Sequence, residues 1–233
     1  MSDCLVLDLK SVLPDFECMD DTEYNRIEEE NRRQRENEIK ISRLTHYRSF
    51  ESGVPKRYWN ESFDTYKPQN DGEKHNVERL RFFVEENNNK VVVLCGNNGT
   101  GKTLLGCAVI RERGGLYKPM LKLVYEVDSS MSFKASQTKT QLLDKLCEQK
   151  MLVLDEVGRG VQQERQAELL YYILNERYGA MLPTVLISNL SKIDLVKFLG
   201  EAVKDRLNET CEFLEFNGKS YRATKRQEAG TDF

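Results

Sequence analysis

The residues best suited to chemistry lie in one glycine-rich stretch near the middle of the chain. The stretch follows an apolar run at 91–95 and opens a periodic segment at 104–113. Its members are Gly96, Asn97, Asn98, Gly99, Thr100, Gly101, Lys102 and Thr103. The glycines let successive backbone N–H groups turn around a polyphosphate, and a following helix adds the positive end of its dipole. We expect Lys102 to reach the β- and γ-phosphates of a bound nucleotide, and Thr103 to ligate Mg²⁺.

Two other polar groups follow short apolar runs. Asp155 and Glu156 come directly after the run at 151–154, and Asn189 ends the run that begins at 183. Ligands of open α/β sheets sit at the carboxyl ends of strands, so these side chains should converge on the glycine-rich loop. We expect Asp155 to hold Mg²⁺ mostly through water, and Glu156 to orient or deprotonate the water that attacks the γ-phosphate. Asn189 could hydrogen-bond the γ-phosphate or that water.

The elements that must position these residues alternate along the chain. Strands are expected at 90–95, 121–127, 151–154, 183–189 and 211–216, and helices at 73–86, 104–113, 163–178 and 191–199, with another helix around residues 142–146. The strand at 121–127 rests on the alternation of Leu121, Leu123, Tyr125 and Val127. This order predicts an α/β fold with a parallel sheet covered by helices on both faces. The aromatic stretch at 58–66 should mostly pack on the core, although some rings could line an adenine pocket.

Size and composition allow one sizeable α/β domain with an appendage. The chain has 233 residues, of which 39% are hydrophobic and 31% charged, and its net charge is −3. This charge gives no overall attraction to nucleic acid, so DNA binding would need a local basic patch. The six cysteines form no C-x-x-C pair and lie far from both histidines, which argues against a zinc site. No signal peptide is visible, and no apolar run approaches the ~20 residues that cross a bilayer, so we expect a cytoplasmic protein without membrane association.

Three parts are expected along the chain. Residues 1–50 should form a charged helical arm, residues 51–225 the nucleotide-binding domain, and residues 226–233 a frayed tail. The segment at 21–43 is dense in Glu and Arg, many of them three or four residues apart, so side-chain pairs can support a solvated helix. Two interpretations of this arm stay open, a merely solvated helix and a surface that docks on a partner.

From about Ser52 to Arg222 the sequence resembles the AAA+ ATPases of the bacterial helicase-loader (DnaC-like) and IstB-like transposition-helper group. The resemblance rests on blocks that occur in a fixed order: Ser-Gly-Val-Pro-Lys-Arg at 52–57, the glycine-rich loop, Leu-Val-Leu-Asp-Glu-Val-Gly at 152–158, Leu-Asn-Glu-Arg-Tyr at 174–178, Ile-Ser-Asn-Leu at 187–190, Leu-Gly-Glu at 199–201, Asp-Arg-Leu at 205–207 and Ser-Tyr-Arg at 220–222. It implies a P-loop NTPase fold of the AAA+ type, with ATP and Mg²⁺ as ligands. The loop, Asp155 with Glu156, and Asn189 would then be Walker A, Walker B and sensor 1.

The same resemblance suggests roles for two arginines. Arg206 looks like the arginine finger, which usually comes from the next subunit, and Arg222 looks like the sensor-2 arginine; either could instead form a surface ion pair. A finger in trans implies ATP-dependent self-association. Ala202 stands where the family commonly has arginine, so that role is not filled by this residue. Little chain follows Arg222, so we expect the helical lid to be truncated or absent.

The resemblance also implies a function. The main hypothesis is an ATPase of DNA replication that binds a replicative hexameric helicase through the N-terminal arm and loads it onto single-stranded DNA. Phe133 and Lys134, in a polar loop, could stack a base and contact a phosphate, although Phe133 could equally pack in the core. One alternative is an IstB-like helper that delivers target DNA to a transposase. Another is a nucleotide-gated binding module with negligible hydrolysis, against which Glu156 argues.

Overall fold

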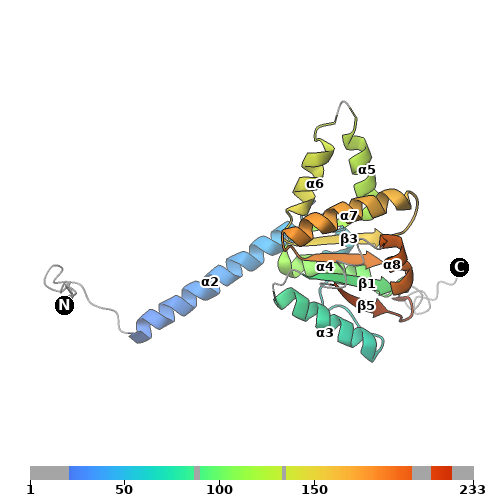
Figure 1. The fold of residues 1–233 in the computed structure, drawn as a ribbon. Helices are drawn as coiled ribbons and strands as arrows, with labels where there is room; N and C mark the ends of the chain where they lie inside the picture. Colours follow the sequence, from blue (N-terminus) through green and yellow to red (C-terminus); the bar gives the residue numbers. More distant parts are fainter. Residues whose placement is uncertain (1–20, 87–89, 133–134, 201–210, 222–233) are drawn as a thin grey trace, which may run out of the picture. The chain divides into compact units, whose positions relative to one another are not determined.

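The structure is a computed structural model that describes residues 21–86, 90–132, 135–200 and 211–221 (Figure 1). Its contacts divide the chain into two units, Met1–Ser42 and Arg43–Phe233. Five residues that the sequence analysis singles out lie outside the described residues. They are Phe133, Lys134, Ala202, Arg206 and Arg222.

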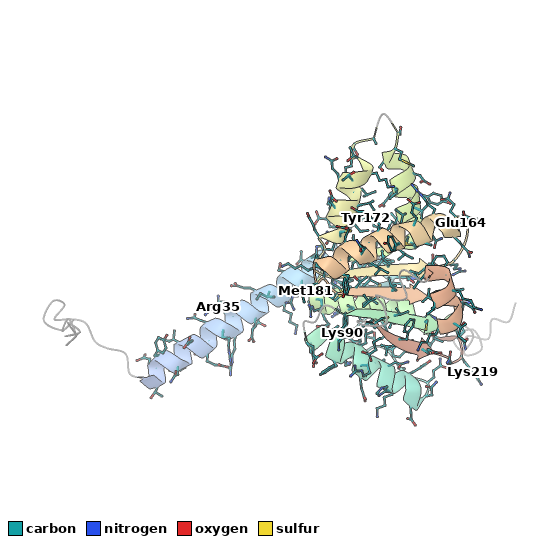
Figure 2. All side chains as sticks on the ribbon, in the orientation of Figure 1. Arg35, Lys90, Glu164, Tyr172, Met181 and Lys219 are labelled. Atoms are coloured by element: carbon teal, nitrogen blue, oxygen red, sulfur yellow. The ribbon has the colours of Figure 1, made fainter. Side chains whose placement is uncertain are left out.

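The described part of the first unit belongs to one long helix, α2 (Asp21–Tyr47). Nearly all of its side chains up to residue 42 are exposed, and Figure 2 shows them, Arg35 among them, as sticks that point outward from the helix. Ion pairs run along its surface, where Glu29 accepts from Arg33 Nε at 3.1 Å and also pairs with Arg32. The helix predicted from the Glu and Arg spacing is therefore present.

The second unit contains a five-stranded sheet and the helices around it. Its remaining elements are η1 (Lys56–Tyr58), α3 (Asp71–Glu85), β1 (Val91–Gly96), α4 (Lys102–Arg113), β2 (Leu116–Pro119), α5 (Met120–Ser130), α6 (Lys139–Cys147), β3 (Leu152–Val157), α7 (Gln163–Gly179), β4 (Thr184–Ser188), α8 (Lys192–Leu199) and β5 (Cys211–Phe216). The sheet order is β2-β3-β4-β1-β5, and every pairing is parallel. None of the helices in the described ranges is long and apolar enough to cross a membrane.

Both faces of the sheet are buried, as the continuous apolar runs of its central strands require. Along β1 the side chains alternate between two core clusters. Val92 and Leu94 join the cluster that contains Leu80 of α3 and Leu105 of α4. Their neighbours Val91, Val93 and Cys95 join the second cluster, whose other members come largely from α5, α6, α7 and α8. Helices therefore cover both faces, and the predicted parallel α/β architecture is confirmed.

One secondary-structure prediction is wrong. The stretch at 121–127 is not a strand but part of the helix α5, and the short strand β2 precedes it. The alternating pattern misled because the same residues also carry a helical stripe. Met120, Leu123, Val124 and Val127 are fully buried, at the i, i+3, i+4 and i+7 spacing of a helix, whereas Tyr125 is 51% exposed. Pro119 ends β2 and stands directly before the helix, where its missing N–H costs nothing.

Candidate nucleotide-binding site

The glycine-rich loop connects β1 to α4 and follows a path that only glycine can take at its tightest points. Gly99 and Gly101 have φ angles of 79° and 91°, in the left-handed region. A Cβ atom at Gly99 would lie 2.1 Å from Oγ of Ser220, and one at Gly101 would lie 2.6 Å from Cε2 of Tyr66. Neither position can therefore carry a side chain without moving the wall behind it.

Neighbouring segments hold this loop by its backbone. Tyr66 donates its hydroxyl to the carbonyl of Thr100 at 3.0 Å, and the same hydroxyl lies 3.1 Å from Oε2 of the buried Glu73. On the other side, the N–H of Tyr221 donates to the carbonyl of Gly99 at 3.0 Å. The loop is thus fixed between the segment that precedes α3 and the segment that follows β5. Such rigid support is what a backbone cradle for phosphate needs.

Lys102 begins α4 and folds back over the loop. Its Nζ donates to the carbonyl of Gly96 at 2.9 Å and also to that of Asn97, and the side chain is only 4% exposed. Burial lowers the pKa of Lys102 to about 8, and the nearby Asp155 carboxylate offsets part of this effect. The ammonium is therefore held in a poorly hydrated place, where a phosphate oxygen would be a better partner than two neutral carbonyls.

Asp155 lies in β3, and its carboxylate faces the start of α4. Thr103 donates its hydroxyl to Oδ2 of Asp155 at 2.8 Å, although the two residues are 52 positions apart. Tyr117 of β2 donates to the same oxygen at 2.6 Å, and the N–H of Glu156 donates to Oδ1 at 2.6 Å. Asp155 is 3% exposed, so this carboxylate is buried but well supplied with donors.

Glu156 and Asn189 stand beside Asp155 at the ends of adjacent strands. Glu156 has a φ of 60°, a left-handed conformation that is uncommon for glutamate, and its side chain is exposed. Its Oε1 lies 3.4 Å from Nη1 of Arg159, on the loop that follows β3. Before Asn189, Ser188 donates its hydroxyl to the carbonyl of Val157 at 2.8 Å, which ties the ends of β4 and β3 together.

These strand ends enclose one cavity of about 350 Å³. Of the loop, Asn98, Gly99, Gly101, Lys102 and Thr103 line it, together with Asp155, Glu156 and Asn189. The structure therefore brings together the residues that the sequence analysis placed at three strand ends. Gly96, Asn97 and Thr100 form the support instead: Thr100 is fully buried, and its hydroxyl donates to the carbonyl of Asn97 at 3.0 Å.

Sequence reasoning missed some residues of this site. Arg159 lines the cavity as well as approaching Glu156, and Glu61, Thr65 and Lys67 form part of its wall. Of the aromatic stretch that could line an adenine pocket, Tyr58 and Tyr66 do line the cavity. Tyr117 gave no signal, because a tyrosine in a short strand is usually a packing residue.

The oxygen atoms at this site suit Mg²⁺. Among the described residues there is no group of three or more His, Cys, Asp or Glu side chains that could hold a metal ion by itself. What is present is a hydroxyl and a carboxylate, from Thr103 and Asp155, within hydrogen-bond distance of each other. Mg²⁺ is usually held by one or two protein oxygen ligands, with phosphate and water oxygens completing the shell. The donor set therefore fits Mg²⁺ that arrives with a nucleotide.

Relatives of this chain include proteins of DNA replication. "Replicative helicase loader DnaC" of Escherichia coli (strain K12) is 30% identical over 179 residues, which cover 74% of this chain and 73% of that protein. "Uncharacterized protein YdaV" of the same strain is 26% identical over 209 residues, which cover 84% of this chain and 79% of that protein.

Solved structures share the architecture. A crystal structure of the DnaC helicase loader matches with a TM-score of 0.60 and 28% identity, over 70% of this chain and 100% of that chain. DnaA from Aquifex aeolicus, bound to AMPPCP, matches with a TM-score of 0.58 and 17% identity, over 77% of this chain and 58% of that chain, and so shares the fold. The fold is thus that of the P-loop AAA+ proteins. Residues 19–229 match the family described as IstB-like ATP binding protein, and the chain belongs to that family.

Proposed function

We propose that this protein is a DnaC-like ATPase that binds a replicative hexameric helicase and loads it onto single-stranded DNA. The observation that carries the ATPase part is the cavity in which the loop, Asp155, Glu156 and Asn189 meet. The observation that favours helicase loading is the 30% identity to a replicative helicase loader over about three quarters of both chains.

The residues of the cavity would have the following roles in ATP binding and hydrolysis. The N–H groups of the loop and the Lys102 ammonium bind the phosphates, and Thr103 with Asp155 holds Mg²⁺, which supplies charge neutralisation when bound. Glu156 accepts a proton from the attacking water, and Asn189 hydrogen-bonds that water or the γ-phosphate. Oε1 of Glu156 lies 3.4 Å from Nη1 of Arg159, so its carboxylate would exchange this partner for water before acting as a base.

Other parts of the proposal concern the arm and residues that lie outside the described ranges. Arg206 from a neighbouring copy and Arg222 would stabilise the negative charge that develops on the phosphates, which makes hydrolysis depend on ATP-dependent self-association. Phe133 and Lys134 would contact single-stranded DNA and stimulate hydrolysis. Residues 1–50 would dock on the helicase, residues 51–225 would bind ATP, and residues 226–233 would be a tail. In support of an arm that docks, α2 carries exposed apolar side chains such as Ile39 and Ile41, at 51% and 65% exposure.

The test is co-purification of the full chain with the cognate hexameric helicase, in ATP and in ADP, followed by loading of that helicase onto circular single-stranded DNA. We expect a complex with the wild type and with Lys102→Ala, but helicase loading with the wild type only. For the arm, the test variant is Ile39→Asp and its matched control is Glu38→Gln, since both positions are exposed in α2. A helicase that never co-purifies, whatever nucleotide is present, contradicts the proposal.

A second candidate function follows from the family match itself. The chain belongs to the IstB-like family, so the same ATPase core could deliver target DNA to a transposase. Capture of the transposase, and not of the helicase, by the ATP-bound protein would favour this function. A nucleotide-gated module without turnover makes a different prediction: wild type and Glu156→Gln would be equally inactive in hydrolysis with single-stranded DNA present.

A further inference from the structure

Tyr117 connects the candidate Mg²⁺ site to a distant part of the fold. It lies in the four-residue strand β2, and its side chain is 4% exposed. Its ring packs in the core cluster that also contains Tyr47, Val54 and Cys107, while its hydroxyl donates to Oδ2 of Asp155 at 2.6 Å. The ring therefore has a packing role, but the hydroxyl has one described acceptor, the carboxylate expected to face Mg²⁺.

The hydroxyl of Tyr117 shares that oxygen with Thr103. Both donate to Oδ2 of Asp155, at 2.6 and 2.8 Å, and the N–H of Glu156 occupies Oδ1 at 2.6 Å. Three donors at these distances fix the plane of a buried carboxylate, which has little freedom to turn. When the Thr103 proton points at Asp155, the lone pairs of the Thr103 oxygen are directed elsewhere and can ligate a metal. The orientation of Asp155 therefore determines where the Thr103 oxygen presents its lone pairs.

The backbone of Tyr117 is held in turn by the Ser52-Gly53 corner, which is the start of the Ser-Gly-Val-Pro block. The N–H of Tyr117 donates to the carbonyl of Ser52 at 2.8 Å. Gly53 has a φ of 70°, and a Cβ atom there would lie only 2.0 Å from the carbonyl oxygen of Tyr117. Ser52 is itself fully buried, and its hydroxyl lies 2.9 Å from the carbonyls of Tyr47 and Ser49. This corner fits closely against one peptide of β2.

We propose that Tyr117 is a positioning residue for the Mg²⁺ site, and that the Ser52-Gly53 corner fixes the backbone of Tyr117 and thereby the distance of its hydroxyl from Asp155. The inference rests on the proposed binding of ATP with Mg²⁺. Tyr117 acts through Asp155 and has no contact with the nucleotide of its own in this assignment. Loss of an outer partner of this kind costs about 10- to 100-fold in metal affinity in well-studied metal sites.

The test is Tyr117→Phe, which keeps the ring and removes only the hydroxyl. Binding of a fluorescent ATP analogue is measured as Mg²⁺ is raised from zero, with EDTA as the zero point. We expect the half-saturating Mg²⁺ concentration to rise about tenfold, while the affinity for the analogue in EDTA stays within twofold of the wild type. Gly53→Ala should move the same half-saturation in the same direction, because its Cβ atom would lie 2.0 Å from the carbonyl oxygen of Tyr117 and would displace that peptide.

The matched control is Tyr47→Phe. Tyr47 is fully buried, belongs to the same core cluster and donates its hydroxyl at 2.6 Å, but to the carbonyl of Tyr58 and not to Asp155. It should lower the melting temperature about as much as Tyr117→Phe does, with the Mg²⁺ half-saturation unchanged. If Tyr117→Phe lowers stability without moving the half-saturation, or weakens binding equally in EDTA and in Mg²⁺, the positioning role is overturned.

A second measurement needs no substitution. Tyrosine labelled with ¹³C at Cζ reports the hydrogen bond of its hydroxyl, and the Tyr117 signal should shift when Mg²⁺ is added to the ATP-bound protein. A signal that stays in place also overturns the proposal. The proposed function fails in a different way, since a wild type that binds no ATP analogue at any Mg²⁺ concentration refutes ATP binding itself. The inference fails alone when the wild type binds in a Mg²⁺-dependent way and Tyr117→Phe does the same at equal concentrations.

Discussion

Replacing Lys102 by methionine should make the nucleotide-free protein more stable while removing its affinity for ATP. Lys102 is 4% exposed, and its ammonium is surrounded by the carbonyls of Gly96 and Asn97 and by the hydroxyl of Thr100, none of which carries a charge. Methionine has a similar length and needs no hydration, so it can occupy the same space without the cost of burying a cation.

The size of the effect follows from the pKa of Lys102. Burial lowers it from an ordinary value of 10.5 to about 8. Each pKa unit corresponds to about 1.4 kcal/mol, so the charged form costs about 3 kcal/mol at neutral pH. Gly96 is half-buried and Asn97 is exposed, so water can replace Lys102 as the donor to their carbonyls. Allowing for this exchange, we expect a gain of about 2 kcal/mol, which raises the melting temperature by roughly 4 to 8 °C in a domain of this size.

The assay is urea unfolding of wild type and Lys102→Met at pH 7 and at pH 9.5, without nucleotide. In the folded chain Lys102 loses its proton near pH 8, and in the unfolded chain near pH 10.5. Between these values the unfolded state binds more protons, so the stability of the wild type rises with pH relative to that of the variant. The difference in the free energy of unfolding should therefore shrink by about 2 kcal/mol between pH 7 and pH 9.5.

The control is Lys74→Met, at an exposed position of α3, which should change stability little at either pH. A Lys102→Met protein that is less stable than the wild type at pH 7 would refute the reasoning. So would a stability difference that does not depend on pH, because the burial cost of the ammonium would then not be its source.

Three further predictions concern an ion pair beside the sheet, a buried arginine and the glycine-rich loop. Glu212 accepts two hydrogen bonds from Arg79, at 2.6 and 2.9 Å, and these lower the pKa of Glu212. The roughly 1 kcal/mol that this half-exposed pair contributes to stability should therefore be present above pH 4.5 and lost as pH falls through the folded pKa. Glu212→Gln should abolish that loss in acid unfolding, and identical acid profiles of the two proteins would contradict this prediction. Arg177 is 1% exposed and donates to three carbonyls and one hydroxyl, so Arg177→Met should cost roughly 3 kcal/mol in urea unfolding; a change below 1 kcal/mol would show that water replaces it. Gly101→Ala should weaken nucleotide binding at least tenfold in an equilibrium titration, because the φ of Gly101 is 91° and the new methyl group would lie 2.6 Å from the ring of Tyr66. The control Gly179→Ala has open space around the new methyl group and should bind the nucleotide normally. Equal affinities of the two variants would refute the steric argument.

The parts of the fold that the sequence predicted are those in which one period or one spacing dominates. The run at 151–154 is apolar throughout, and the run at 183–188 has an apolar centre at 185–187, so burial on both faces was the consistent interpretation. In the structure β3 and β4 are buried from end to end apart from Glu156. The loop, Asp155 and Asn189 could be placed together because parallel strands end at the same edge. The helix expected at 191–199 begins where Ser191 can cap it, and the Ser191 side chain accepts from the N–H of Asp194 at 3.1 Å.

What the sequence could not supply depends on contacts between distant segments. The stretch at 121–127 satisfies both a period of two and a helical stripe, and only its packing against the sheet decides between them. Tyr117 donates to Asp155, which lies 38 positions away in the sequence. Arg177 donates to backbone carbonyls, among them those of Cys147 and Gln149, and carbonyl partners cannot be predicted from residue types. The assignments of Arg206, Arg222, Phe133 and Lys134, and the boundaries at 50 and 225, stay predictions.

The edge strand β2 also limits how copies of this chain can associate. Along its outer side the one N–H group, from Tyr117, already donates to Ser52, and two residues later Pro119 has none to offer. Leu116 directs its N–H inward, to the carbonyl of Met151. Along β2 a second chain therefore finds no N–H donor with which to continue the sheet at this margin, which disfavours β-augmentation here. In the self-association proposed above, contacts between copies at this margin would therefore be made by side chains and not by a continued sheet.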